Sequence, residues 1–322
     1  MTEQDMGQLG ETLQALRAEI GKAFVGQADV VNDLTVSLLA GGHVLLEGVP
    51  GLGKTLLVKA LSRAIGGEFS RVQFTPDLMP SDVSGHAVYE PATESFRIRR
   101  GPVFTNLLLA DEINRAPAKT QAALLEVMQE GQVTIEGTAS PLEPPFMVVA
   151  TQNPVEHEGT YPLPEAQLDR FLLKVLIDYP DEKHENDIVS AATGNRVGDG
   201  LYVDDLKPVM SSAQIVAAQQ ATARITVDPV VLDYAVRITR HTREASGIRM
   251  GAGPRGTISI IRAARAAAVL AGRDFVTPDD VRQVCIPALR HRIALAPELE
   301  IESYKPDDIL AELLKDVDAP RQ

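Results

Sequence analysis

The sequence predicts an α/β domain, with a parallel sheet flanked by helices, followed by a helical domain, and three observations carry this prediction. Short apolar segments alternate with helical stretches through the first 180 residues, which is the pattern of a parallel sheet. Beyond residue 181 helical periodicity dominates. Aromatic residues make up only 4% of the 322, with no tryptophan, so the core must be mainly aliphatic, as buried parallel sheets are. We therefore expect two domains, residues 1–180 and residues 181–322.

The first domain is expected to open with an amphipathic helix, because apolar residues recur at helical spacing from Leu9 to Phe24. Further helices are expected at 27–40, 54–65 and 118–130, and strands at 43–47, 71–74, 106–110, 146–151 and 172–177. Two segments, 86–98 and 131–145, place turn residues between short alternating stretches and predict β-hairpins. Projecting hairpins are frequent contact points for partners.

In the second domain the helices are expected at 182–192, 211–221, 228–245, 254–271 and 278–290. Asp228 and Thr277 each precede a proline at the start of a helix and are expected to cap it. The single cysteine, Cys285, lies in an apolar helical stretch and is expected in the core. One cysteine excludes both a disulfide and a cysteine-based zinc site within the chain.

The charge balance argues against a nucleic-acid-binding protein. The chain has 31 basic and 44 acidic residues, a net charge of −13, whereas proteins that hold DNA through its phosphates are usually basic. Arg97, Arg99 and Arg100 form the strongest local basic group, and the edge of a solvated hairpin or a subunit contact also explains them. The first ten residues lack the apolar stretch of a signal peptide, and no run reaches the ~18 apolar residues of a membrane helix. We expect a cytoplasmic protein without membrane insertion.

A glycine-rich loop between a strand and a helix predicts a phosphate-binding site. The segment 48–55 reads GVPGLGKT, a full Walker A motif, and it follows an apolar strand and opens a helix. Glycines let backbone amides turn toward phosphate oxygens, Lys54 reaches the β and γ phosphates, and the Thr55 hydroxyl coordinates Mg²⁺. ATP and Mg²⁺ are the expected cofactors. The expected nucleotide-binding residues here are Gly48, Pro50, Gly51, Leu52, Gly53, Lys54, Thr55 and Leu56.

Two further strands end in polar residues that fit the same chemistry. The strand 107–110 is followed by Asp111, a Walker B carboxylate for Mg²⁺, and by Glu112, which can polarise the attacking water. Asn153 ends the next strand, where its amide can position water or sense the γ-phosphate; an Asx turn before a proline is the alternative. Adjacent parallel strands end side by side, so these groups are expected to meet.

Two arginines are candidates for completing the site. Arg170 closes a short helix and can face a neighbouring subunit's nucleotide, or form an ion pair with Asp169 or Glu165 in its own chain. Arg255 begins a helix of the second domain and can reach back over the phosphates, with Arg249 and Arg262 as competitors. The six histidines show no metal spacing: the pair 157–158 reads as half a zinc motif without its second histidine.

The chain resembles the MoxR family of AAA+ ATPases over residues 20–292. The resemblance is carried by the runs VGQ (25–27), EGVPGLGKT (47–55), QFTPDLMPSD (73–82), DEINRA (111–116) and EGTYPLPEAQLDRF (158–171). It implies an AAA+ α/β core with a helix-2 insert, a pre-sensor-1 hairpin and a C-terminal all-helical lid domain.

The resemblance also implies roles for individual residues and partners. Asn153 would be sensor 1, Arg170 the arginine finger and Arg255 sensor 2, with Val25 and Gly26 near the adenine. The context of Arg255, GAGPRG instead of the usual GASPR, departs slightly from the family pattern. Family members are thought to form homo-hexamers and to act as chaperone-like remodelers of protein clients, often with a partner that has a von Willebrand factor A domain.

Four hypotheses follow from the sequence. The leading one is an ATP-driven remodeler whose hairpins act on a protein client. A nucleic-acid motor is the second, and it would need a basic hairpin such as Arg97, Arg99 and Arg100 provide. A nucleotide-gated scaffold is disfavoured by intact Lys54, Asp111 and Glu112. A chelatase-type motor subunit is the fourth, and no signature selects it.

Overall fold

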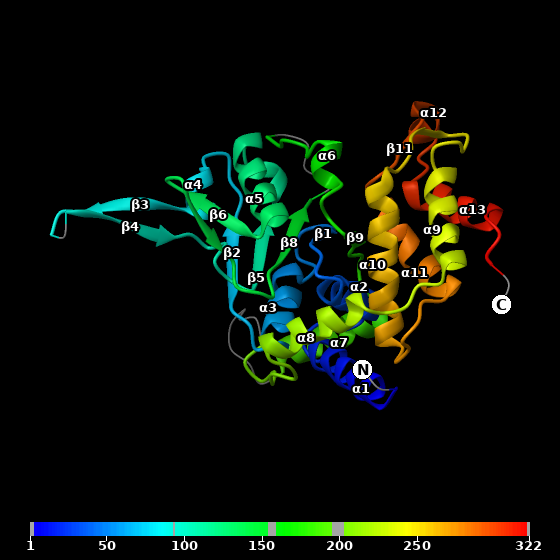
Figure 1. Ribbon diagram of the computed structural model, residues 1–322, viewed down its shortest axis with the longest axis horizontal. Coiled ribbons are helices and arrows are strands. Elements are labelled where there is room, and N and C mark those ends of the chain that lie inside the picture. The colour runs from blue at the N-terminus through cyan, green and yellow to red at the C-terminus, as the bar shows by residue number, and fades with distance from the viewer. Residues whose placement is uncertain (1–2, 93, 154–158, 195–202, 321–322) are drawn as a thin grey trace.

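A computed structural model describes residues 3–92, 94–153, 159–194 and 203–320 (Figure 1), so the histidine–glutamate pair at 157–158 lies outside the described residues. Its centre is a five-stranded sheet of order β2-β5-β8-β1-β9 in which every neighbouring pair is parallel. The strands are β1 (Val44–Glu47), β2 (Phe69–Gln73), β5 (Leu107–Asp111), β8 (Met147–Gln152) and β9 (Leu173–Leu176). The predicted α/β sheet is confirmed.

The direction of the side chains, which point alternately to the two faces of the sheet, explains why both faces are covered. Leu107 and Leu109 of β5 belong to one apolar core, and Leu108, between them, belongs to the other. Because successive side chains of a strand point to opposite faces, a continuous apolar run such as this one must be buried on both sides.

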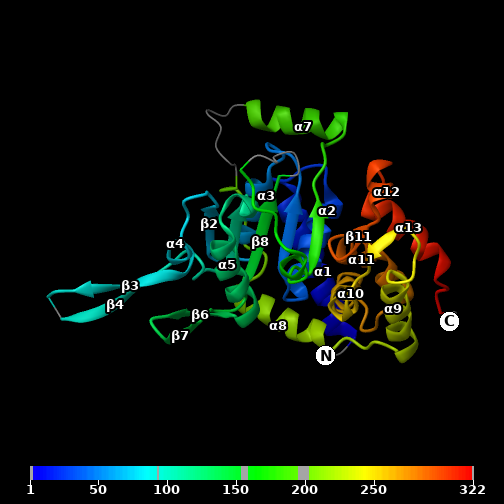
Figure 2. The same cartoon turned by 90° about the horizontal axis from the view of Figure 1, so that it is seen from above.

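Helices pack on each face of the sheet and complete the two apolar cores. The first core is formed with α1 (Glu3–Gly21), α2 (Ala28–Leu39) and α3 (Lys54–Ala64), and the second with α4 (Pro80–Ser84), the 3₁₀ turn η1 (Ile113–Arg115) and α5 (Ala118–Glu130). Both predicted hairpins are present. One is β3 (Gly85–Glu90) with β4 (Ser95–Arg100), and the other is β6 (Gln132–Ile135) with β7 (Thr138–Pro141). The β3–β4 hairpin extends far from the body of the molecule in both views (Figures 1 and 2).

The C-terminal part is helical, with one small addition that the sequence pattern did not predict. Its helices are α7 (Glu182–Thr193), α8 (Ser212–Ala223), α9 (Pro229–His241), α10 (Pro254–Leu270), α11 (Pro278–Leu289), α12 (Pro297–Ile301) and α13 (Pro306–Asp316), whereas the short helix α6 (Glu165–Leu168) precedes β9 in the α/β part. A two-stranded antiparallel ladder, β10 (Ile248–Met250) with β11 (Ala294–Leu295), pairs the segment before α10 with the segment after α11. The expected caps are present: the side chains of Asp228 and Thr277 accept hydrogen bonds from the first turns of α9 and α11.

Several helices beyond residue 180 lie against the α/β core, since α8 and α10 contact α2 and α11 contacts β9. Gln219 of α8 donates to the carbonyl of Leu38 at 2.7 Å, which ties α8 to α2. Helix α7 lies apart from the other lid helices, on the opposite side of the sheet domain from α8 (Figure 2).

Cys285 is buried as expected, and burial raises the pKa of its thiol to about 12. None of the described helices is long and apolar enough to cross a bilayer.

A half-buried histidine directly before β1 makes stability depend on pH. The Val148 N–H donates to His43 Nδ1, and His43 Nε2 lies 3.0 Å from the Met128 carbonyl, so the ring is neutral with its proton on Nε2. Burial lowers the pKa of His43 to about 4 from its ordinary 6.5. A lowered pKa in the folded state means that the unfolded chain takes up the proton first as pH falls. Stability is therefore complete above pH 6.5 and is lost as pH falls toward 4.

We expect the free energy of unfolding to fall by about 2 kcal/mol between pH 7 and pH 5 through His43 alone. Urea unfolding of the wild type and of His43→Gln at both pH values measures this contribution. The variant should lose that part of the pH dependence, whereas His86→Gln, on the exposed hairpin, should keep it. An unchanged pH dependence in His43→Gln would show that the ring is not neutral in the folded state.

Candidate nucleotide-binding site

Three strands bring the predicted phosphate and magnesium residues to one edge of the sheet. Glu47, the last residue of β1, pairs with Gln152 of β8, and β5 is the other neighbour of β8. The P-loop follows β1, Asp111 and Glu112 end β5, and Asn153 follows β8, where it is buried. The carboxyl ends of parallel strands meet at such an edge, which is where ligands bind in open α/β sheets.

The glycines of the loop are required by its geometry. Gly51 and Gly53 have φ values of +86° and +75°, which side chains rarely adopt. A Cβ on Gly48 would lie 2.6 Å from the carbonyl oxygen of Ile177. Helix α3 starts at Lys54 and has no acidic residue in its first turn, so its N-terminal amides and dipole remain available to an anion.

The remaining loop residues support this arrangement. Leu52 and Leu56 are half-buried and pack against the core, so their contribution to binding would come from their backbone amides. Pro50 is exposed at the tip of the loop. Thr55 lies in the first turn of α3, where its hydroxyl would serve Mg²⁺.

Lys54 lies between the strand ends and is held there by backbone carbonyls. Its ammonium donates to the carbonyl of Gly48 and, at 3.3 Å, to that of Gln152. Partial burial lowers its pKa, and the carboxylates of Asp111, Glu112 and Glu47 act in the opposite direction. The cation is therefore placed between the loop and the acidic strand end, where a bound triphosphate would compete for it.

Both oxygens of Asp111 have partners. The Thr151 hydroxyl donates to Oδ1 at 2.6 Å, and Arg71 donates to Oδ2 from Nη2 at 2.6 Å and from Nε at 3.1 Å. No group of three His, Cys, Asp or Glu side chains in the described residues is arranged to hold a metal ion. Asp111 and Thr55 offer oxygen ligands of the kind that Mg²⁺ prefers, and they are the residues that would hold it.

Glu112 is held in a constrained position directly after β5. Its backbone is left-handed, with φ of +57°, and its N–H donates to Thr151 Oγ1 at 2.8 Å. Gln73 Nε2 donates to its carboxylate at 2.6 Å, and Arg115 Nε lies 3.3 Å from the same oxygen. The sequence reasoning assigned no role to Gln73 or Arg71. The signal that would have found them is the strand order, because β2 is the neighbour of β5 and Gln73 pairs with Asp111.

Removing the Gln73 donor is expected to raise basal ATP hydrolysis. Two donors on the Glu112 carboxylate stabilise its charge and reduce its ability to polarise water. Losing one charge-assisted hydrogen bond corresponds to a rate increase of about tenfold at most. Steady-state hydrolysis by Gln73→Ala measures this, with Gln283→Ala, on the exposed face of α11, as the matched control. A rate at or below the control would mean that Gln73 aligns Glu112 instead of restraining it.

A pocket beside the P-loop collects the residues expected near the adenine. It is lined by Gln14, Arg17, Ala18, Gly21, Phe24, Val25, Gly26, Ala28, Val31, His184 and Asp187. The ring of Phe24 lies 3.4 Å from the position of a Cβ on Gly53, so the pocket adjoins the phosphate loop. Gly26 has φ of +85°, and a Cβ there would lie 2.5 Å from His184 Cβ. No sequence motif marked His184, which α7 brings to the pocket from a distant segment.

Arg170 and Arg255 lie together at the opposite edge of the sheet. Arg170, Arg255 and His43, the residue that precedes β1, line one pocket, and Arg255 Nη1 is 3.6 Å from the Asp169 carboxylate. The P-loop begins beyond the other end of β1, a strand of four residues that spans about 13 Å. The structure therefore does not bring Arg255 over the phosphates of its own chain, contrary to the expectation from sequence. Helix α10, in whose first turn Arg255 lies, packs against this amino edge instead.

Two other arginines hold this edge together. Arg292 is buried and donates to the Asp169 carboxylate at 2.7 Å and to the Phe171 carbonyl at 2.6 Å. Arg262, one of the competitors considered, donates to the carbonyls of Ala40 and Gly41. Both arginines therefore connect the lid to the core.

Arg170 and Arg255, in contrast, keep donors available. Arg170 donates to the Leu125 carbonyl at 2.7 Å, and its buried Nε has no hydrogen-bond partner among the residues described. Arg255 is 55% exposed, and its contact to Asp169 is long for an ion pair. Neither alternative partner considered for Arg170, Asp169 or Glu165, forms an ion pair with it in the described part of the chain.

A parallel sheet in this order, with a phosphate loop after β1 and carboxylates after β5, is the architecture of AAA+ ATPases, and the chain is a member of that class. The model of the ATPase family associated with various cellular activities (AAA) matches residues 43–173, and the AAA lid domain model matches residues 240–313. ATP hydrolysis is the activity that this class defines.

Within the class, the chain belongs to the MoxR family. It is 44% identical to Chaperone MoxR1 of Mycobacterium tuberculosis over 319 residues, which covers 96% of this chain and 83% of that protein. It is 33% identical to Protein MoxR of Methylorubrum extorquens, with coverage of 94% and 93%. A crystal structure of a candidate ATPase from Cytophaga hutchinsonii superimposes with a TM-score of 0.90 at 40% identity, covering 99% of this chain and 98% of that one.

Proposed function

We propose that the protein hydrolyses ATP at sites shared between neighbouring subunits of a closed homo-oligomer, a hexamer in the family pattern, and uses the resulting movements to remodel protein clients. The observation that carries this proposal is the separation of the two halves of the site. Lys54 and Glu112 lie at the carboxyl edge of the sheet, while Arg170 and Arg255 lie at the amino edge. In a ring with head-to-tail interfaces, one edge of each subunit can face the other edge of the next.

The chemistry assigned to each residue follows from its position. The α3 amides and Lys54 would hold the β and γ phosphates, and Glu112 would polarise the attacking water. When bound, Mg²⁺ would supply positive charge that offsets the charge of the phosphates, and Asp111 and Thr55 are the residues that would hold it. Arg170 and Arg255 of the adjacent subunit would stabilise charge on the transferring phosphoryl group, so both arginines act in trans under this proposal.

Two observations support a protein client. The name of the Mycobacterium tuberculosis relative describes that protein as a chaperone. The net charge of −13 also favours a protein client over nucleic acid. A partner with a von Willebrand factor A domain belongs to the same proposal, because the family resemblance implies one.

Concentration dependence tests the shared site directly. Turnover per chain should rise steeply with protein concentration as subunits assemble, because an isolated subunit has a P-loop but no trans arginine. Sedimentation velocity under the same conditions should show that the rise in rate coincides with oligomer formation. A rate per chain that stays constant while the protein passes from monomer to oligomer would refute shared sites.

A further inference from the structure

The β3–β4 hairpin carries exposed apolar side chains on both of its strands. Every residue of β4 is exposed, including the apolar Phe96 and Ile98. Phe96 is 73% exposed and Tyr89 is 50% exposed, and their rings contact each other edge to face with centroids 5.4 Å apart. The hairpin projects away from both cores (Figures 1 and 2), so nothing in the described part of the chain covers its tip.

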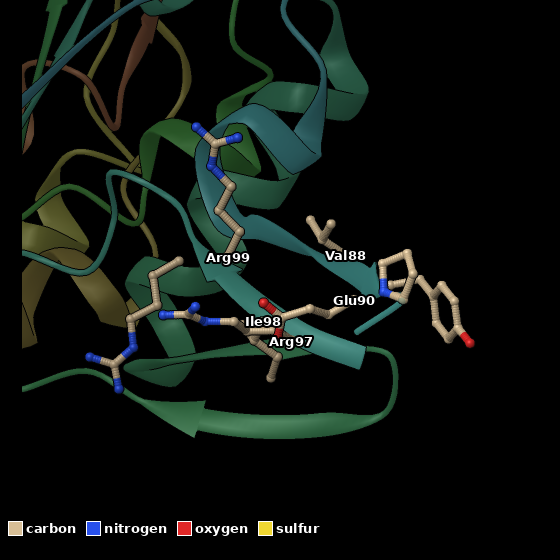
Figure 3. A pocket seen from close by; sticks show the side chains of 8 residues that line it. Val88, Glu90, Arg97, Ile98 and Arg99 are labelled. Atoms are coloured by element: carbon tan, nitrogen blue, oxygen red, sulfur yellow. The ribbon is translucent and has the colours of Figure 1, made fainter. Parts of the chain in front are cut away.

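The pairing of the strands gives the hairpin two different faces. Tyr89 pairs with Phe96, and Ala87 pairs with Ile98, which makes one face apolar. Directly opposite residues of an antiparallel pair share a face, so the pairs Val88–Arg97 and His86–Arg99 form the other, basic face. Figure 3 shows Ile98 and Arg99 leaving β4 on opposite sides, with Val88 on the same side as Arg99.

The outer edges of the hairpin offer backbone hydrogen-bonding groups. β3 and β4 form a sheet of only two strands, so within the described residues neither strand has a ladder partner on its outer side. An exposed strand edge can accept an extended peptide as a further strand, with main-chain hydrogen bonds giving affinity and alternate side chains giving specificity. The added segment would place alternate side chains on the apolar and on the basic face.

The charge of the hairpin indicates what that segment carries. β4 has three arginines and no acidic residue, and with Glu90 and Glu94 near the tip the hairpin 85–100 has three arginines against two glutamates, in a chain whose net charge is −13. The basic face of the hairpin, on a protein that is acidic as a whole, steers acidic segments of a client polypeptide to the hairpin, because the rest of the surface repels them. Resting on the proposed function, we infer that the β3–β4 hairpin binds an extended client segment in which acidic and large apolar residues alternate.

The observations favour a polypeptide over a nucleic acid at this hairpin. Tyr89 and Phe96 already engage each other, and the adjoining exposed side chains Val88 and Ile98 are aliphatic. Stacking of bases needs free aromatic faces, whereas aliphatic side chains pack readily against aromatic and aliphatic neighbours. Single-stranded nucleic acid remains an outcome of the test, because arginines also attract phosphates.

The test uses the full chain and fluorescence anisotropy with three labelled probes. The first is a twelve-residue peptide that alternates glutamate with leucine and valine, the second replaces every glutamate by lysine, and the third is a twelve-nucleotide DNA strand. We expect the acidic peptide to bind and the basic peptide not to bind. Phe96→Ser and the double variant Arg97→Glu, Arg99→Glu should each weaken binding at least about tenfold.

Matched controls separate the hairpin from surface effects elsewhere. Ile301→Ser removes an 84% exposed apolar side chain on α12, and Arg240→Glu reverses an exposed charge on α9; both should leave peptide affinity unchanged. Equal affinity of the acidic peptide for wild type and hairpin variants, or tighter salt-sensitive binding of the DNA strand, would overturn the inference. So would loss of oligomerisation in the hairpin variants, which would make the hairpin a subunit contact.

Failure of the hairpin inference can be distinguished from failure of the proposed function. Hairpin variants should keep wild-type basal ATP hydrolysis and its dependence on protein concentration, since the hairpin lies far from both halves of the shared site (Figure 1). If these hold and peptide binding does not respond, the hairpin inference fails and the shared-site proposal stands. If the concentration dependence is absent in wild type, the proposed function fails independently of any peptide result.

Discussion

Glu112→Gln is expected to reduce turnover by about 10²–10⁴-fold while leaving ATP binding in place. Glutamine has nearly the same shape but cannot polarise the attacking water as a carboxylate does. The groups that hold the phosphates, Lys54 and the α3 amides, are unchanged. Single-turnover hydrolysis and equilibrium binding of a fluorescent ATP analogue measure the two effects separately.

The neighbouring carboxylate gives the control for this variant. Asp111→Asn removes the residue assigned to Mg²⁺, so its loss of activity should come with a higher Mg²⁺ requirement for nucleotide binding, which Glu112→Gln should not show. Near-normal turnover in Glu112→Gln would remove this residue as the group that polarises water.

Arg170→Ala is expected to lower the rate of hydrolysis by about 10³–10⁵-fold, the range seen when an arginine finger is lost. The reason is that its guanidinium would stabilise charge that develops only as the phosphoryl group transfers. ATP affinity should change far less, because the P-loop that binds ATP lies at the other edge of the subunit. Steady-state rates and nucleotide affinity, both measured above the assembly concentration, test this.

Two comparisons make the Arg170 result specific. Arg240→Ala, on the exposed surface of α9, should keep the wild-type rate. Arg170→Lys should recover only part of the activity, because an ammonium lacks the planar set of donors that a guanidinium presents. A fully active Arg170→Ala protein would leave Arg255 as the remaining candidate at the amino edge.

The sheet and the phosphate site were predictable because local patterns determine them. A run such as Leu107–Ala110 is buried on both faces wherever it occurs, and the spacing of Gly48, Gly53 and Lys54 demands a strand before it and a helix after it. The two hairpins were predictable from turn residues between alternating stretches. The rule that parallel strands end at the same edge then brings the residues at the strand ends together, but it does not give the order of the strands.

The rest depends on tertiary packing that no local pattern records. Arg71 and Gln73 reach Asp111 and Glu112 only because β2 is the neighbour of β5 in the sheet. The position of Arg255 depends on the edge of the sheet against which α10 packs, and its sequence context is equally compatible with either edge. His184 reaches the pocket at Gly26 because α7 leaves the other lid helices.

Mixing two inactive variants tests the shared site most directly. Lys54→Ala lacks the phosphate-binding lysine but keeps Arg170, and Arg170→Ala keeps Lys54, so each alone should be nearly inactive. In randomly mixed rings about one quarter of the interfaces would join an intact P-loop to an intact neighbouring arginine. The account predicts that mixing restores ATP hydrolysis to roughly that fraction of the wild-type rate. A mixture as inactive as its two components, in rings shown to contain both, would contradict it.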